Sequence, residues 1–126
     1  MQWANADVVV IVNRDNQVSA MTAVEVANFY LGRTRVFKPE GNALILEQPR
    51  DCTLREEFFR RLNGMPIKQL NAYWARLEFS GEVQPPRALD DSRAVLDAVR
   101  KNRNAIGYID AALVDSSVRV VLTLKD

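Results

Sequence analysis

The 126-residue sequence contains no histidine and a single cysteine, Cys52. The lack of histidine excludes Ser-His-Asp and Cys-His nucleophile systems, and it also excludes the usual His-ligated zinc site. One cysteine cannot form a disulfide within the chain, so cysteine usage indicates no redox compartment. We therefore expect a protein that is not an enzyme and that needs neither a metal nor a cofactor.

Long hydrophobic runs and an excess of either charge are missing as well. The longest apolar run, residues 8–12, is far shorter than the stretch of about 20 residues that a bilayer-spanning helix needs. Seventeen Lys and Arg residues oppose sixteen Asp and Glu residues, which leaves a formal net charge of +1. Because nucleic-acid-binding proteins carry a clear basic excess, we expect neither nucleic-acid binding nor membrane insertion.

The composition that remains fits one globular domain. A hydrophobic fraction of 48% and a charged fraction of 26% are ordinary values, and this length suits a single core. We expect the domain to span residues 7–126, because Ala4-Asn5-Ala6 has the small-x-small form of a signal-peptidase site. Two interpretations of residues 1–6 stay open: the stub of a removed export signal with Met1 added for expression, or a native start with chance alanines.

The hydrophobic pattern predicts strands and helices in alternation. We expect strands at residues 7–12, 43–46, 105–109 and 118–124, with the last an edge strand or a half-exposed strand, and a loop at residues 36–42. We expect helices at residues 22–32, 54–62 and 66–81, and a fourth that begins at Asp91 or Ser92. This order predicts an α/β domain with a mostly parallel sheet flanked by helices.

Local motifs refine these expectations. Thr22 with Glu25, and Thr53 with Glu56, have the form of capping boxes. Gly107 inside a strand pattern indicates a close backbone approach or a bend.

Two groups of side chains have structural interpretations. The spacing of Tyr73, Trp74 and Phe79 favours core packing over a ligand groove. A solvated helix face with pairs such as Glu56–Arg60 and Glu57–Arg61 explains the alternating charges, which are Arg55, Glu56, Glu57, Arg60 and Arg61.

Four segments resemble parts of the phosphate-binding proteins of ABC importers, which are type II periplasmic solute-binding proteins. They are residues 8–13, 28–33, 73–81 and 105–109, within a resemblance that covers roughly residues 7–124. The resemblance implies one lobe of a type II periplasmic-binding-protein-like fold, as a short single-lobe member. It also implies a bacterial transport role in the periplasm, after removal of a signal peptide.

The family places an Arg and then Ser-Gly-Thr at a helix N-terminus, followed by a Phe. There the backbone N–H groups, a hydroxyl and the helix dipole hold an oxyanion, and the Arg adds a charge-assisted grip. One register, which matches Arg55 and Phe58, puts Cys52-Thr53-Leu54 in place of Ser-Gly-Thr and Gln48 in place of the Arg. A second register matches Thr53 with the Thr and puts Glu47 in the Arg position.

The resemblance therefore implies a non-enzymatic binding protein for phosphate or another small oxyanion. The implied ligand-binding residues are Asn13, Arg50, Cys52, Thr53, Leu54 and Arg55. For Cys52 and Thr53 the alternative is an ordinary N-cap threonine beside a small buried cysteine. For the whole chain the alternative is a ligand-free interaction or assembly module, which acts through a homodimer or a protein partner and pairs or swaps its terminal strand.

Overall fold

The computed structural model describes residues 7–126, so the predicted signal stub at residues 1–6 lies outside the described residues. The strands are β1 (Val8–Asn13), β2 (Val36–Phe37), β3 (Gly41–Asn42), β4 (Leu44–Glu47), β5 (Arg87–Ala88), β6 (Ala105–Asp110) and β7 (Val118–Leu124). The helices are α1 (Ala23–Tyr30), α2 (Thr53–Asn63), α3 (Ile67–Ser80), α4 (Ser92–Lys101) and the short 3-10 helix η2 (Ala111–Leu113). The predicted α/β class is confirmed.

Five strands form the main sheet, in the order β5-β4-β6-β1-β7. β4 pairs in parallel with β5 and β6, whereas β1 pairs antiparallel with both β6 and β7. Four strands therefore run in one direction, which confirms a mostly parallel sheet and leaves β1 as the reversed strand. β7 lies at the edge, as predicted. The predicted loop at residues 36–42 instead contains the β2–β3 hairpin.

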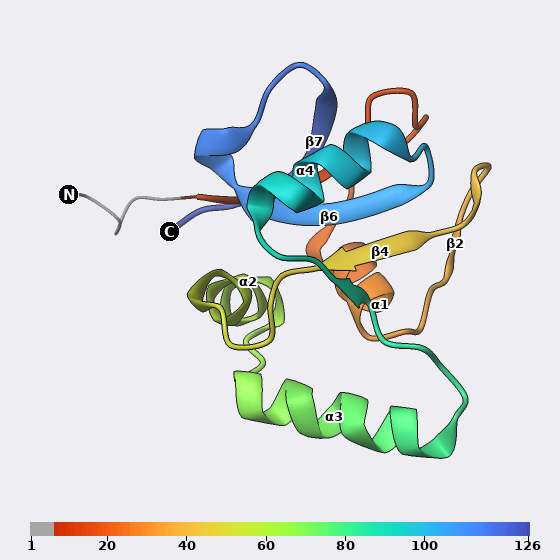
Figure 1. The fold of residues 1–126 in the computed structure, drawn as a ribbon, viewed down its shortest axis with the longest axis vertical. Helices are drawn as coiled ribbons and strands as arrows, with labels where there is room; N and C mark the ends of the chain where they lie inside the picture. The colour runs from red at the N-terminus through yellow and green to blue at the C-terminus, as the bar shows by residue number, and fades with distance from the viewer. Residues whose placement is uncertain (1–6) are drawn as a thin grey trace.

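Helices cover both faces of the sheet. Alternate residues of β1 point to opposite sides, so the strand contributes to two cores. Val9 and Ile11 belong to the core under α4, with Val95 and Val99. Val8, Val10 and Val12 belong to the core shared with α1 and α2. Figure 1 shows α4 crossing over β6, with α2 and then α3 farther along the long axis of the molecule.

Aromatic rings fill the core beneath α1 and α2. Phe58 stacks on Tyr108 with ring centroids 3.7 Å apart, and Tyr30 meets both rings edge-on. The indole Nε1 of Trp74 donates to the Tyr30 carbonyl at 3.1 Å, which fastens α3 to the end of α1. Core packing is thus confirmed for Trp74. It is wrong for Phe79, because that ring is 96% exposed.

The first predicted capping box is confirmed and the second is wrong. The Thr22 hydroxyl accepts from the Glu25 N–H at 3.1 Å, and the Glu25 carboxylate accepts from the Thr22 N–H at 2.8 Å. In α2, Cys52 takes the N-cap position and Thr53 becomes the first helical residue, without a side-chain cap bond. The helix therefore begins at Thr53, one residue earlier than the capping pattern requires.

The charged pattern on α2 also differs from the prediction. Arg60 and Arg61 both pair with Glu57, so the Glu57–Arg61 pair is confirmed while the predicted Glu56–Arg60 pair is not formed. Arg55 is wrong as a member of a solvated face, because it is 7% exposed. Its partner is Glu47 at the end of β4, a contact that spacing along one helix cannot reveal.

Candidate functional site

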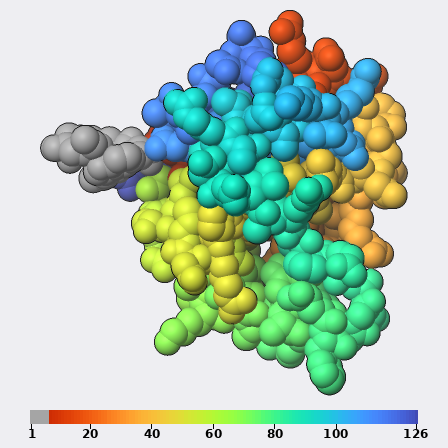
Figure 2. All heavy atoms as spheres, in the orientation of Figure 1, coloured from red at the N-terminus to blue at the C-terminus, as the bar shows by residue number. Residues whose placement is uncertain are grey.

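A hollow of ≈ 870 Å³ opens where the carboxyl ends of β4 and β6 meet the N-termini of α2 and α4. In sheets with parallel strands, ligands bind in the crevice outside these carboxyl ends. Figure 2 shows the yellow atoms of the α2 region directly below the teal atoms of the α4 region. The residues that line this main hollow are Asp7, Val8, Gln48, Pro49, Cys52, Thr53, Leu54, Glu57, Arg61, Asp90, Asp91, Ser92, Arg93, Asp110 and Leu113.

The N-terminus of α2 presents backbone donors to the main hollow. Its N–H groups at Arg55 and Glu56 bond to the Cys52 carbonyl, at 3.1 and 3.3 Å. The N–H groups of Thr53 and Leu54 bond to no residue within 7–126. The helix dipole adds partial positive charge at this end, so the two free donors suit an anion.

The N-terminus of α4 is closed by its own side chain. Asp91 accepts from the Ala94 N–H at 2.9 Å, as one of the two predicted capping residues. The N–H groups of Ser92 and Arg93 have no bond within residues 7–126, but the Asp91 carboxylate at this end would repel an anion, so the α2 end is the better candidate for anion binding.

Gln48 connects the elements around the main hollow. It is 1% exposed, and its Nε2 donates to the Tyr108 carbonyl at 2.9 Å and to the Ser92 hydroxyl at 3.0 Å. Its Oε1 accepts no hydrogen bond from the described part of the chain. Gln48 stands at the position that one register of the family resemblance gives to an arginine, so a neutral amide replaces a cation there.

A buried ion pair joins the end of β4 to the first turn of α2. Arg55 Nε faces Glu47 Oε2 at 3.3 Å as an ion pair without hydrogen-bond geometry, and each side chain is 8% exposed. Burial raises the pKa of Glu47, while the hydrogen bond from Tyr108 and the charge of Arg55 oppose the shift. Arg55 Nη1 donates to the Arg50 carbonyl and to Asn71 Oδ1, at 3.2 and 3.0 Å. The Arg55 charge is therefore used internally.

The structure divides the predicted ligand residues among three places. Cys52, Thr53 and Leu54 lie together at the main hollow. Arg50 and Arg55 border a second hollow of ≈ 210 Å³ beneath α3.

Asn13 lies at the end of β1 that is away from the main hollow. The other end of the strand, at Val8, pairs with Asp110, which lines the hollow. Its Nδ2 donates to the Val99 and Arg100 carbonyls at the end of α4, at 2.9 and 3.0 Å. In this structure Asn13 therefore ties β1 to α4.

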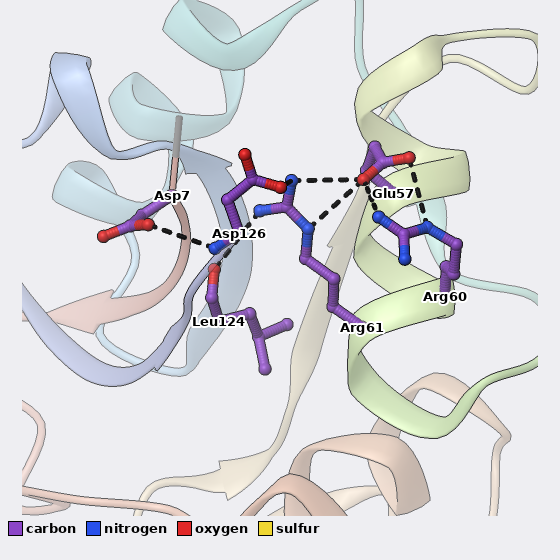
Figure 3. Close-up of polar contacts among 6 residues, drawn as sticks. All are labelled: Asp7, Glu57, Arg60, Arg61, Leu124 and Asp126. Atoms are coloured by element: carbon purple, nitrogen blue, oxygen red, sulfur yellow. Dashed lines mark hydrogen bonds and ion pairs between the residues drawn. The ribbon is translucent and has the colours of Figure 1, made fainter. Parts of the chain in front are cut away.

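The cations that do line the main hollow are Arg61 and Arg93, neither of which is among the predicted ligand-binding residues. Arg61 pairs with Glu57 and with Asp126, each at 3.1 Å. Figure 3 shows this contact network, in which Asp7 also accepts from the Asp126 N–H at 3.4 Å. Neighbouring carboxylates thus already share the charge of Arg61.

Comparison with known proteins identifies the fold. No model of a protein family and no curated protein matches the chain. Solved structures do match it.

A phosphate ABC transporter substrate-binding protein from Clostridium perfringens, with bound phosphate, has a TM-score of 0.74 at 22% identity, over 93% of this chain and 45% of its own. An ABC-type phosphate transport receptor from Vibrio cholerae has a TM-score of 0.72 at 16% identity, over 92% of this chain and 45% of the receptor. PstS from Borrelia burgdorferi has a TM-score of 0.71 at 11% identity, over 93% and 47%.

These similarities confirm the predicted periplasmic-binding-protein-like fold. The chain spans about half the length of the binding proteins that it matches. No helix in residues 7–126 is long and apolar enough to cross a bilayer.

Proposed function

We propose that the protein is a non-enzymatic solute-binding lobe, which holds phosphate or another small oxyanion at the N-terminus of α2. The observation that supports this is the pair of free N–H groups at Thr53 and Leu54, which open onto the main hollow. The fold is shared with binding proteins of phosphate importers, one of which contains bound phosphate. By analogy we place the protein in the periplasm, exported and working with a transporter.

The proposed anion receives donors from one turn of helix. The N–H groups of Thr53 and Leu54 and the Thr53 hydroxyl donate to its oxygens, beside the dipole of α2. Of the predicted cations, Arg55 is engaged by Glu47 and Arg50 borders the second hollow. We therefore assign the supporting positive charge to Arg93, which lines the main hollow.

Calorimetric titration with phosphate and sulfate at low salt tests this proposal. The sharpest variant is Thr53→Pro, which removes one N–H and the hydroxyl. Proline is favoured at the first position of a helix, and Cys52 already has extended backbone angles compatible with a following proline. We expect the variant to fold and to lose the heat of anion binding.

Ala23→Pro is the matched control, because Ala23 is the first residue of α1 and follows the extended Thr22. It should fold and bind as the unmodified protein does. The absence of heat at millimolar phosphate from folded protein would remove the proposal. Equal binding by Thr53→Pro would move the site away from α2.

The second candidate function is an assembly module that acts through a homodimer. One observation favours it: Phe79 on α3 is 96% exposed. Pairing through β7 is hindered, because Met21 N–H already bonds to the Val121 carbonyl at 2.9 Å on that strand. We therefore place the contact between two copies at α3.

Light scattering distinguishes this candidate from the first. A homodimer that Phe79→Ser converts to a monomer would support it. A monomer at high micromolar concentration would count against it.

A further inference from the structure

We propose that the ligand of the main hollow is zwitterionic: a small molecule that carries an ammonium group together with its oxyanion. This inference rests on the proposed function for the anionic end of the ligand. It narrows the proposed ligand to an organic class that does not include bare inorganic anions.

The size of the main hollow is the first support. Its ≈ 870 Å³ lies within the range of about 300–1,000 Å³ that is typical of sites for organic ligands. An anion held at the α2 N-terminus by Thr53 and Leu54 would occupy only one side of this space. The remaining volume faces the start of α4 and the end of β6.

The charges on that opposite side are negative on balance. Outside α2, the main hollow is lined by the carboxylates of Asp7, Asp90, Asp91 and Asp110 and by one guanidinium group, that of Arg93, whereas on α2 Glu57 pairs with Arg61. Asp91 and Asp110 each use one oxygen to cap a backbone N–H, at 2.9 Å, and keep the other. Asp90 has no hydrogen bond or ion pair with any residue in the described part of the chain. A bare dianion would experience this field as repulsion, whereas an ammonium group would be attracted.

Gln48 supplies an independent indication. A polar side chain that is 1% exposed normally satisfies its acceptor, yet Gln48 Oε1 accepts nothing from residues 7–126. Its Nε2 is held by Ser92 and Tyr108, so the free atom of the amide is an acceptor. The dianion of a phosphate monoester has no proton to give it and inorganic HPO4²⁻ has one, whereas an ammonium group has three donors.

A metal ion is a weaker explanation of the same carboxylates. The described residues contain no group of three or more Cys, Asp or Glu side chains arranged to hold one ion. The carboxylates instead border a wide space, which suits a larger cation on an organic framework. The positive end of the α2 dipole and the net negative side formed by α4 and β6 together suit a ligand whose positive and negative groups are separated.

Calorimetry with matched ligands tests the inference. O-phosphoethanolamine and ethyl phosphate share the phosphate and the two-carbon skeleton, and only the first carries an ammonium group. We expect O-phosphoethanolamine to bind at least about tenfold tighter at low salt, in line with one charge-assisted contact. Asp90→Asn combined with Asp110→Asn should clearly reduce this ratio, without weakening ethyl phosphate.

The control variant is Asp115→Asn, because Asp115 also caps a backbone N–H, at Ser117, but does not line the main hollow. It should leave the ratio unchanged. If phosphate and ethyl phosphate bind as well as O-phosphoethanolamine, the inference is overturned and the proposed function stands. If none of the three binds, both fall. If ethanolamine alone binds as tightly as O-phosphoethanolamine, the site recognises only the cation and the inference is again overturned.

Discussion

At the scale of single residues, Gly107 shows how closely α4 approaches the sheet. A Cβ atom at this position would lie 2.5 Å from Val95 Cγ1 and 3.4 Å from Val99 Cγ2. Gly107→Ala should therefore lower the free energy of unfolding by about 1–3 kcal/mol, as overpacked cores do. Urea denaturation measures this change in the free energy of unfolding. In a Val95→Ala background the same change should cost clearly less, and an equal cost in both backgrounds would refute the contact with Val95.

Glu47 and Glu57 should have opposite effects on stability as pH changes. Burial raises the pKa of Glu47 above its ordinary 4.5, so the folded state holds this proton more tightly than the unfolded state. The contribution of Glu47 to stability is therefore lost as pH rises from 4.5 through its native pKa. The hydrogen bond from Arg60 lowers the pKa of Glu57, so that contribution is present above 4.5 and lost as pH falls.

Denaturation at several values between about pH 2.5 and about pH 7 tests this pair, because the change expected for Glu57 lies below 4.5 and that for Glu47 above it. Relative to the unmodified protein, Glu47→Gln should make the free energy of unfolding rise more with pH, and Glu57→Gln should make it rise less. Glu47→Gln should also cost about 3–5 kcal/mol near neutral pH, because Arg55 would stay buried without its counter-ion. An unchanged pH slope in Glu47→Gln would show that Glu47 titrates normally.

The sequence allowed some residue roles to be predicted and concealed others. The roles of Thr22 and Gly107 depend on neighbours within a few positions or on the lack of a Cβ, so local reasoning was sufficient. The burial of Arg55 depends on Glu47, which precedes α2 and lies at the end of a strand. Arg55 appears in the sequence as one charge among several on a polar helix, and only the packing of α2 against β4 sets it apart.

At the scale of elements, the two predicted capping boxes give a direct comparison. Thr22→Ala should lower the free energy of unfolding by about 1 kcal/mol, since it removes a real cap bond. Thr53→Ala should change it by less than about 0.5 kcal/mol, because Thr53 makes no cap bond. Thermal or urea unfolding of both variants measures the difference. Equal losses would restore Thr53 as the N-cap and weaken the case for a free helix end.

Element existence could be predicted wherever the hydrophobic period was sustained, as in α3 and β7. The strands β2, β3 and β5 have two residues each, which is too short for any period to appear. The direction of β1 was also hidden, because a fully buried strand has the same apolar run in either orientation. The two faces of β1 are covered as predicted, but its neighbours run the other way.

At the scale of the whole molecule, the main hollow is assembled from parts of the chain that are far apart in sequence. Asp7, Gln48, Thr53, Ser92 and Asp110 meet only because β4, β6 and β1 are adjacent in the sheet. The resemblance located the α2 portion, since its motif is local. It did not indicate Gln48 as a tether or the carboxylates of the opposite side, because those depend on the topology. The same topology places Asn13 at the opposite end of β1.

The central claim is that an oxyanion binds at the free N–H groups of α2, and amide-resolved NMR during a phosphate titration tests it most directly. The account predicts that the backbone amides of Thr53 and Leu54 shift most, in a saturable manner, while those of Ala23 and Val24 at the start of α1, which do not line the main hollow, do not move. Saturable binding with the largest shifts at Arg55 and Asn71 in the second hollow, or no shift at Thr53 and Leu54, would contradict it.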